Sequence, residues 1–244
     1  MTLEMAALTH KGMIRSANED ALYYGVDDRV TIICDGMGGH AGGQVASELG
    51  VQVVANCLRN LRPQDWQDEE RVIDVVKNAI FDANDAILGR ARMDAALFDM
   101  GTTIVACAFM DEQVITANVG DSRIYRIADG EIEQVSEDHS LVQEKIRAGE
   151  LMAGSPEAKM LSNILTRALG MEQVTVDITV EELEAGDIYL LCTDGLSDVV
   201  QDYEMRDVIQ GVAGDLALGC SRLIDLANER GGPDNVTAAL ARYS

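Results

Sequence analysis

Short β-branched segments make up much of the chain, and their order relative to two long helical patterns constrains the fold more than any other feature. Many of these segments are rich in valine and isoleucine and end at glycine or aspartate, which is typical of β-strands. Asp129-Gly130 and Asp111-Glu112 predict tight turns between neighbouring strands. The predicted strands are Met5–Leu8, Ala21–Val26, Val30–Cys34, Thr102–Phe109, Val114–Asn118, Arg123–Ile127, Ile132–Val135, Val174–Val180, Ile188–Cys192 and Val236–Ala241.

Apolar residues recur at helical spacing in two stretches between the early and the middle strands. These stretches run over Val45–Leu61 and Val72–Ile87, and a third lies near the C-terminus over Leu216–Ala227. The helical patterns stand together between blocks of strands and do not alternate with single strands. This order indicates an antiparallel α+β layered fold, because regular alternation would favour a parallel sheet.

The composition favours one domain over residues 1–244. The chain is 47% hydrophobic, has 3 prolines and contains no linker-like, low-complexity or repeated segment. Residues 139–165 are polar and broken by Gly149, Gly154 and Pro156. We expect a mobile, partly helical insertion there, with a plain surface excursion as the alternative.

Charge and cysteine usage limit the partners and the compartment. The net charge is −23, and a field of that sign repels nucleic acid and anionic membranes. The five cysteines form no close pairs, and four of them lie in apolar stretches, so we expect buried thiols and not disulfides or zinc ligands. The N-terminus lacks a signal-peptide pattern and no apolar run is long enough to span a membrane. These features predict a cytoplasmic protein.

Carboxylates recur at the ends of the predicted strands. Each such aspartate stands beside a glycine or a turn, and the set comprises Asp35, Asp121, Asp194 and Asp234, with Glu19 and Asp20 at the start of another strand. Any one of them is explained as an ordinary turn residue. Loops at strand ends can converge in a layered fold, however, and the repetition favours a shared site.

A cation would explain why such carboxylates gather. Clustered carboxylates repel and raise one another's pKa unless a cation lies between them. Oxygen ligands without clustered His or Cys suit Mg²⁺ or Mn²⁺, and the spacing does not match an EF-hand loop. Two ions about 3.5–4 Å apart would activate a water and neutralise a phosphoryl group. Gly36 would let a backbone carbonyl act as a ligand. Arg15 could bind phosphate oxygens, with a surface ion pair as the alternative.

The glycine-rich turn after Asp35 has a second interpretation. Gly36–Ala41 fits G-x-G-x-x-A, which is a dinucleotide-binding pattern. That pattern needs an acid about twenty residues further on, and no acid occurs between Glu48 and Asp65. The charge of Asp35 would also repel a pyrophosphate. The metal interpretation is therefore favoured over an oxidoreductase.

Seven motifs in order resemble the metal-dependent Ser/Thr protein phosphatases of the type 2C (PPM) family, in their compact bacterial form. The match covers nearly the whole chain, and the motifs are specific in combination, although each is weak alone. They are RSANED (Arg15–Asp20), DGMGGH (Asp35–His40), GTT (Gly101–Thr103), NVGDSRIYR (Asn118–Arg126), LTRALG (Leu165–Gly170), CTDGLSD (Cys192–Asp198) and GGPDNVT (Gly231–Thr237).

The resemblance implies a four-layer αββα sandwich, in which helix pairs flank two antiparallel sheets. It implies two core Mn²⁺ or Mg²⁺ ions bridged by Asp35 and held further by Gly36, Asp194 and Asp234. A third ion would be held by Asp121 with Asp194, and Glu19 and Asp20 would act mostly through waters. Arg15 would bind the substrate phosphate, and residues 139–165 would form a flap beside the site.

The chain departs from the family pattern at two places. Larger relatives have a histidine directly after the metal-bridging Asp-Gly, where this chain has Met37, and His40 follows only after two more glycines. The general acid is therefore left open between His40 and a metal-bound water, with a structural role as the alternative for His40. Lys159-Met160 replaces a His-Pro pair in the flap.

The resemblance implies hydrolysis of phosphoserine and phosphothreonine by direct attack of metal-activated water. The implied partners are phosphorylated proteins, including a Ser/Thr kinase, and the protein would act as a monomer. The alternative is a catalytically silent regulator that keeps the fold and binds partners. Such regulators lose metal-binding aspartates, whereas the four aspartates named above are all present.

Overall fold

Two antiparallel sheets stack face to face in the computed structural model, which describes residues 2–38, 42–161 and 164–244. One sheet has the order β1-β11-β10-β7-β8 and the other β2-β3-β5-β6-β9, with β4 paired to β3. The strands are β1 Leu3–His10, β2 Asp20–Gly25, β3 Val30–Met37, β4 Gly101–Thr102, β5 Ile104–Phe109, β6 Gln113–Val119, β7 Arg123–Ala128, β8 Glu131–Gln134, β9 Asp177–Glu182, β10 Ile188–Cys192 and β11 Val236–Tyr243.

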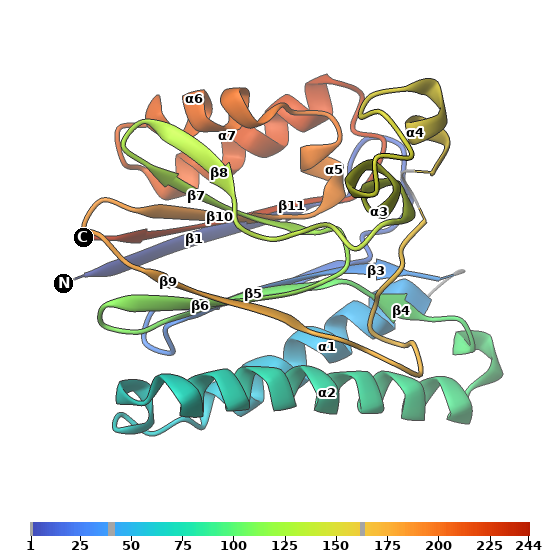
Figure 1. Cartoon of the computed structure of the whole chain (residues 1–244), viewed down its shortest axis with the longest axis horizontal. Helices are drawn as coiled ribbons and strands as arrows, with labels where there is room; N and C mark the ends of the chain where they lie inside the picture. Colours follow the sequence, from blue (N-terminus) through green and yellow to red (C-terminus); the bar gives the residue numbers. More distant parts are fainter. Residues whose placement is uncertain (1, 39–41, 162–163) are drawn as a thin grey trace.

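Helices cover the outer face of each sheet, so the molecule has four layers (Figure 1). α1 (Gly42–Arg59) and α2 (Glu69–Met93) pack on the β3 sheet, and α5 (Asp194–Ser197), α6 (Asp202–Gln210) and α7 (Leu216–Glu229) pack on the β11 sheet. The short elements are η1 Asp65–Gln67, η2 Ala95–Leu97, α3 Leu141–Arg147 and α4 Pro156–Leu161. The predicted αββα sandwich is confirmed.

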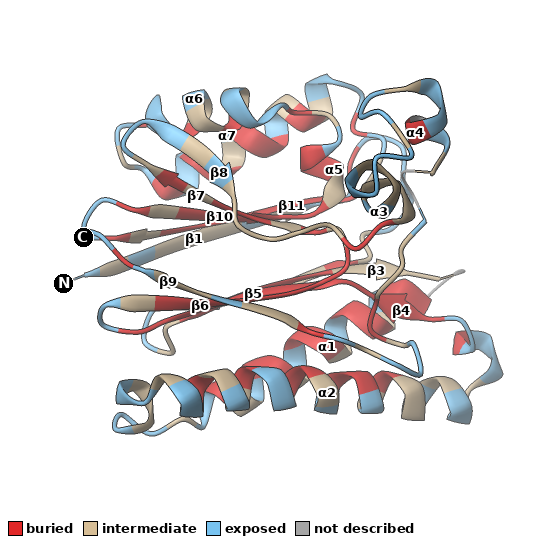
Figure 2. Cartoon of the chain, in the orientation of Figure 1, coloured by how far each residue is buried: buried red, intermediate tan, exposed pale blue. Residues whose placement is uncertain are grey.

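Alternation along the central strands builds three separate cores. In β5 every residue is buried, and successive side chains face opposite sides of the sheet. Val105 and Phe109 face the other sheet, whereas Ile104 and Ala108 face α1 and α2. Between the sheets, Phe109 meets Tyr189 edge to face at 5.8 Å between ring centroids. Figure 2 shows the buried residues gathered in the strands and on the inward sides of the helices.

Local signals account for several element boundaries. Asp68 caps α2 by accepting from the Arg71 N–H, and Glu69 and Glu70 complement the positive end of the helix dipole. Asp129 and Gly130 both have positive φ, as a type I′ hairpin turn requires.

Several sequence predictions differ from the structure: β1 and β3, for example, extend beyond their predicted ends to Leu3–His10 and Val30–Met37. Thr102–Phe109 is interrupted at Thr103, and the predicted strand Val174–Val180 lies at Asp177–Glu182. α6 was not predicted, because only Met205 and Ile209 of its residues are buried. Four cysteines are buried and all five are free thiols, as expected. None of the described helices is long and apolar enough to cross a membrane.

Candidate metal centre

The carboxylates from separate strand ends line one cavity. It measures about 810 Å³, and its lining includes Thr103 just after β4 and Asp194 at the start of α5. Figure 1 shows β4 and α5 far from the two termini. Of the predicted site residues, Arg15, Glu19, Asp35, Gly36, Asp121, Asp194 and Asp234 line it. Asp20 is not among the lining residues and is 8% exposed. His40 falls outside the described residues, so its predicted role stays a prediction.

The backbone of Asp35 is hydrogen-bonded to Thr102 and Thr103, where the chain passes from β4 to β5. Its backbone N–H donates to the Thr103 hydroxyl over 3.0 Å, and the Thr103 N–H donates back to the Asp35 carbonyl over 2.9 Å. Thr102 donates its hydroxyl to the same carbonyl over 2.7 Å. These three bonds fix the end of β3, so Asp35 enters the cavity from a rigid backbone.

Asp20 pairs with Asp35 in the β2–β3 register and is therefore its neighbour across the ladder. One carboxylate oxygen of Asp20 accepts from the hydroxyls of Thr237 over 2.6 Å and Thr193 over 3.1 Å. The other oxygen is buried without a partner among the described residues, and the same holds for one oxygen of Asp194. Buried orphan carboxylate oxygens are what a cation or its bound water would satisfy.

The loop before β11 is tied to the loop after β1. Asn235 accepts from the Glu19 N–H over 2.8 Å and donates to the carbonyls of Lys11 and Ala17. Asp234 accepts from Arg15 over 2.7 Å, and the Arg15 side chain is 57% exposed. Arg15 and Asp234 are thus brought together, and the surface ion pair foreseen as the alternative role of Arg15 is present.

The glycines after Asp35 and Asp194 are required by close packing. A side chain at Gly36 would collide with the backbone oxygen of Gly43 at the start of α1. A side chain at Gly195 would collide with the carbonyl of Asn235. Each Asp-Gly pair therefore places a carboxylate where a second segment presses against the backbone. Whether the Gly36 carbonyl binds a metal remains the prediction made from the sequence.

Burial and mutual repulsion raise the pKa values of the clustered carboxyls. Burial, helped by nearby carboxylates, raises the pKa of Asp20 to about 7, that of Asp121 to about 7 and that of Asp194 to about 6. The pKa of Asp35 is raised well above its ordinary value by burial first and then by Asp20. Asp20 is the most shielded, because the other three keep part of their surface open to the cavity.

The donor set fits hard divalent cations and not zinc. Oxygen donors dominate the cavity lining, and Arg15 is the one Lys or Arg among the described lining residues. Within residues 2–38, 42–161 and 164–244, no three acidic, His or Cys side chains already surround one point. Mg²⁺ characteristically retains several waters between itself and the protein, so its protein ligands need not all surround one point.

Sequence reasoning missed several residues that support the site. Thr103 and Asn235 lie in motifs quoted for the resemblance, yet neither was given a role. Asp198 lines the cavity and ends the CTDGLSD motif. The dinucleotide interpretation is wrong, because β3 and β5, the strands before and after α1 and α2, pair antiparallel, whereas that pattern belongs to a parallel βαβ unit.

Comparisons with known proteins agree with this geometry. The family model described as Protein phosphatase 2C matches residues 14–218. Serine/threonine phosphatase stp of Listeria welshimeri is 37% identical over 236 residues, covering 95% of this chain and 92% of that protein. Serine/threonine protein phosphatase PstP of Mycobacterium tuberculosis is 36% identical over 241 residues, which cover 99% of this chain but 45% of PstP, so the chain spans about half of that relative.

A solved structure of the PstP catalytic domain in complex with two manganese ions superposes with a TM-score of 0.87 at 36% identity. The match covers 98% of this chain and 97% of that chain.

Proposed function

Since this chain belongs to the protein phosphatase 2C family, we propose that it is a metal-dependent phosphatase of phosphoserine and phosphothreonine in proteins. The observation that carries the proposal is the convergence of Asp35, Asp121, Asp194 and Asp234 on one cavity that also holds Arg15. A silent regulator would be expected to have lost part of this set.

Two core ions and a third would share these carboxylates. We propose that Asp35, Asp194, Asp234 and the Gly36 carbonyl hold the core Mn²⁺ or Mg²⁺ ions, with Glu19 and Asp20 acting through waters. Asp121 would hold a third ion with Asp194. When bound, such ions would activate a water molecule and neutralise negative charge on the phosphoryl group. The manganese-bound relative supports the core pair.

The chain's own residues would bind and orient the substrate. Arg15 offers a planar fork that matches phosphate oxygens, and its exposed side chain can leave Asp234 once that carboxylate is neutralised. Thr103 and Asn235 hold the backbones of Asp35 and Glu19, so the carboxylates need little rearrangement to act. The general acid stays open between His40 and a bound water.

Residues 139–165 contribute the flap in this proposal. Ile164 is 45% exposed and lines the cavity together with Leu165 and Met171. These side chains would contact the residues that flank the phosphorylated one. We also propose that the substrates include a Ser/Thr kinase and that the protein acts as a monomer in the cytoplasm. The free thiols support a reducing compartment.

Hydrolysis of a phosphothreonine peptide tests the proposal. Wild-type protein should release phosphate with Mn²⁺ and stop when EDTA is added, and Asp194→Ala should lose activity under both conditions. Asp85→Ala, at an exposed position on α2, is the matched control and should keep wild-type activity. Phosphate release that survives EDTA would contradict the mechanism. A wild type that binds Mn²⁺ but releases no phosphate from any phosphopeptide would favour the silent regulator.

A further inference from the structure

A buried histidine lies where the flap segment 139–165 joins the rest of the domain. His139 is 4% exposed and stands between β8 and α3. The proposed chemistry does not use it. Its side chain and backbone contact three parts of the chain that are far apart in sequence. The ring contacts to Gly120 and Asp177 make Nδ1 an acceptor and Nε2 a donor.

The ring of His139 is bonded to the turn that carries Asp121. The Gly120 N–H donates to Nδ1 of His139 over 3.1 Å, and the His139 N–H donates to the Gly120 carbonyl over 2.9 Å. Because Nδ1 accepts a hydrogen bond, it carries no proton, and the ring must carry its proton on Nε2. His139 therefore holds both backbone polar groups of the residue before Asp121.

The second ring nitrogen of His139 faces the start of β9. Nε2 lies 2.9 Å from one oxygen of Asp177 and, as the protonated nitrogen, donates to it. Arg167 Nη1 lies 3.2 Å from Nε2 and donates to the other oxygen of Asp177 over 2.8 Å. The N–H of Thr166 donates to the carbonyl of His139 over 2.9 Å. His139 thus links the two ends of the flap segment to each other, to β9 and to the Asp121 turn.

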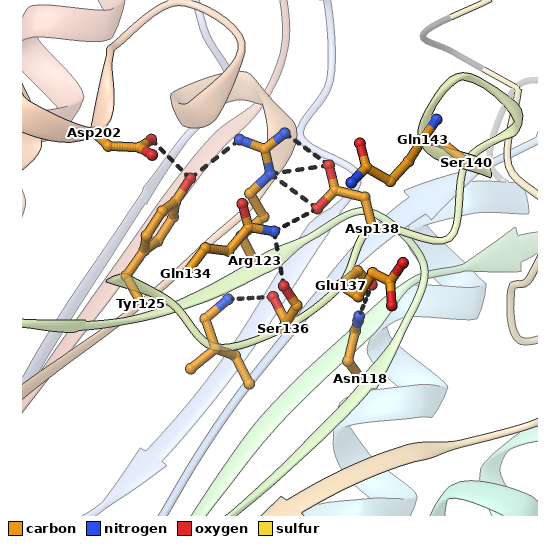
Figure 3. Close-up of polar contacts among 11 residues, drawn as sticks. Asn118, Arg123, Tyr125, Gln134, Ser136, Glu137, Asp138, Ser140, Gln143 and Asp202 are labelled. Carbon is orange, nitrogen blue, oxygen red and sulfur yellow. Dashed lines mark hydrogen bonds and ion pairs between the residues drawn. The ribbon is translucent and has the colours of Figure 1, made fainter. Parts of the chain in front are cut away.

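The residues just before His139 are held by different strands. Figure 3 shows the Arg123 guanidinium directed at Asp138, with bonds of 2.9 Å from Nε and 2.7 Å from Nη2. In the same view Asn118 donates to the carbonyl of Glu137 over 2.6 Å. These bonds restrict movement of residues 137 and 138, although Oδ1 of Asn118 is buried without a partner among the described residues. The backbone that carries His139 is therefore a firm support.

Both segments that His139 joins reach the cavity. Asp121 lines one part of it and Ile164 and Leu165 line another. Gly120 has φ +111°, and an added side chain there would meet Thr103 at 2.6 Å, so the turn is closely packed on its other side.

We propose that His139 is a positioning residue that places the Asp121 carboxylate relative to the flap wall formed by Ile164 and Leu165. One side chain would then fix the positions of both a cation-binding carboxylate and a segment that faces the substrate. The proposal rests on the proposed function for the assignment of a divalent ion to Asp121.

Two amide substitutions test the two ring hydrogen bonds of His139 separately. In His139→Asn the side-chain oxygen lies near the position of Nδ1 and can accept from Gly120, but the shorter side chain does not reach Asp177, which keeps only Arg167. In His139→Gln the terminal amide lies near Nε2 and can donate to Asp177, but the Gly120 N–H is left without an acceptor. Each variant is therefore the matched control of the other.

The first measurement is amide hydrogen exchange at Gly120 in the metal-free protein. Exchange in His139→Gln should be at least about tenfold faster than in wild type, and exchange in His139→Asn should stay close to wild type. The second measurement is Mn²⁺ binding followed by electron paramagnetic resonance. The most weakly bound ion should lose about 10–100-fold in affinity in His139→Gln and little in His139→Asn.

Equal exchange rates at Gly120 in the two variants would overturn the proposal, and so would unchanged Mn²⁺ affinity in His139→Gln. If His139→Gln does not fold, the ¹⁵N chemical shifts of the His139 ring in wild type provide the test, because they show which ring nitrogen carries the proton. A proton on Nδ1 would overturn the proposal. Failure of the proposed function looks different: wild type would release no phosphate from the phosphothreonine peptide, while hydrogen exchange and Mn²⁺ binding would still be measurable.

Discussion

We expect Asp20→Asn to raise the stability of the metal-free protein, relative to wild type, more at pH 8 than at pH 5. The Asp20 carboxyl is buried, and burial raises its pKa from 3.8 to about 7. The folded state therefore holds a proton that the unfolded state releases between these values. Stability must fall as pH rises through this window, because the unfolded state binds fewer protons there.

The magnitude follows from the same pKa values. Each pH unit between 5 and about 7 costs the fold about 1.4 kcal/mol for one such group, so Asp20 alone accounts for a loss of about 2–3 kcal/mol between pH 5 and pH 8. Asp20→Asn removes this pH dependence and keeps the shape and the acceptor for Thr193 and Thr237. The amide group that replaces the orphan oxygen adds a burial cost that is the same at both pH values.

Thermal unfolding in EDTA at pH 5 and pH 8 measures the effect. The melting temperature of Asp20→Asn relative to wild type should rise by about 4–12 °C from pH 5 to pH 8, since 1 kcal/mol shifts it by about 2–4 °C in a chain of this size. Asp85→Asn, exposed on α2, should show no such change. Saturating Mn²⁺ should abolish the loss of wild-type stability between pH 5 and pH 8. A wild-type protein equally stable at both pH values without metal would refute the reasoning.

Three further substitutions probe the parts that hold the site. Gly36→Ala drives a methyl group into the Gly43 carbonyl and should cost more than about 2 kcal/mol, measured by calorimetry, and a wild-type melting temperature would contradict the packing. Thr103→Val leaves the Asp35 N–H unpaired and should cost about 1–3 kcal/mol in urea unfolding, whereas Thr103→Ser should cost little. Arg15→Lys keeps the charge but loses the fork, so KM for a phosphopeptide should rise about three- to tenfold without a change in melting temperature, and an unchanged KM would argue against phosphate binding by this residue.

Local residue patterns were enough to predict most of the elements. The short apolar run IYLLC predicted β10 at its observed bounds, Ile188–Cys192. Asp129-Gly130 predicted a turn whose positive φ values such residues adopt readily. The order of strands and helices indicated the antiparallel class. α6 escaped prediction because its two buried residues make too short an apolar stripe to stand out from a surface loop.

The sequence by itself determined which side chains are available for the chemistry, because aspartates and glycines at strand ends can be read in order along the chain. Only the tertiary structure decided which of them meet. Asp20 and Asp35 became neighbours through strand register. Gly195 met the carbonyl of Asn235, and His139 met Gly120, through the packing of segments that lie 40 and 19 residues apart. Contacts of this kind depend on how whole sheets and loops stack. A local periodicity in the sequence carries no information about which distant segments come into contact.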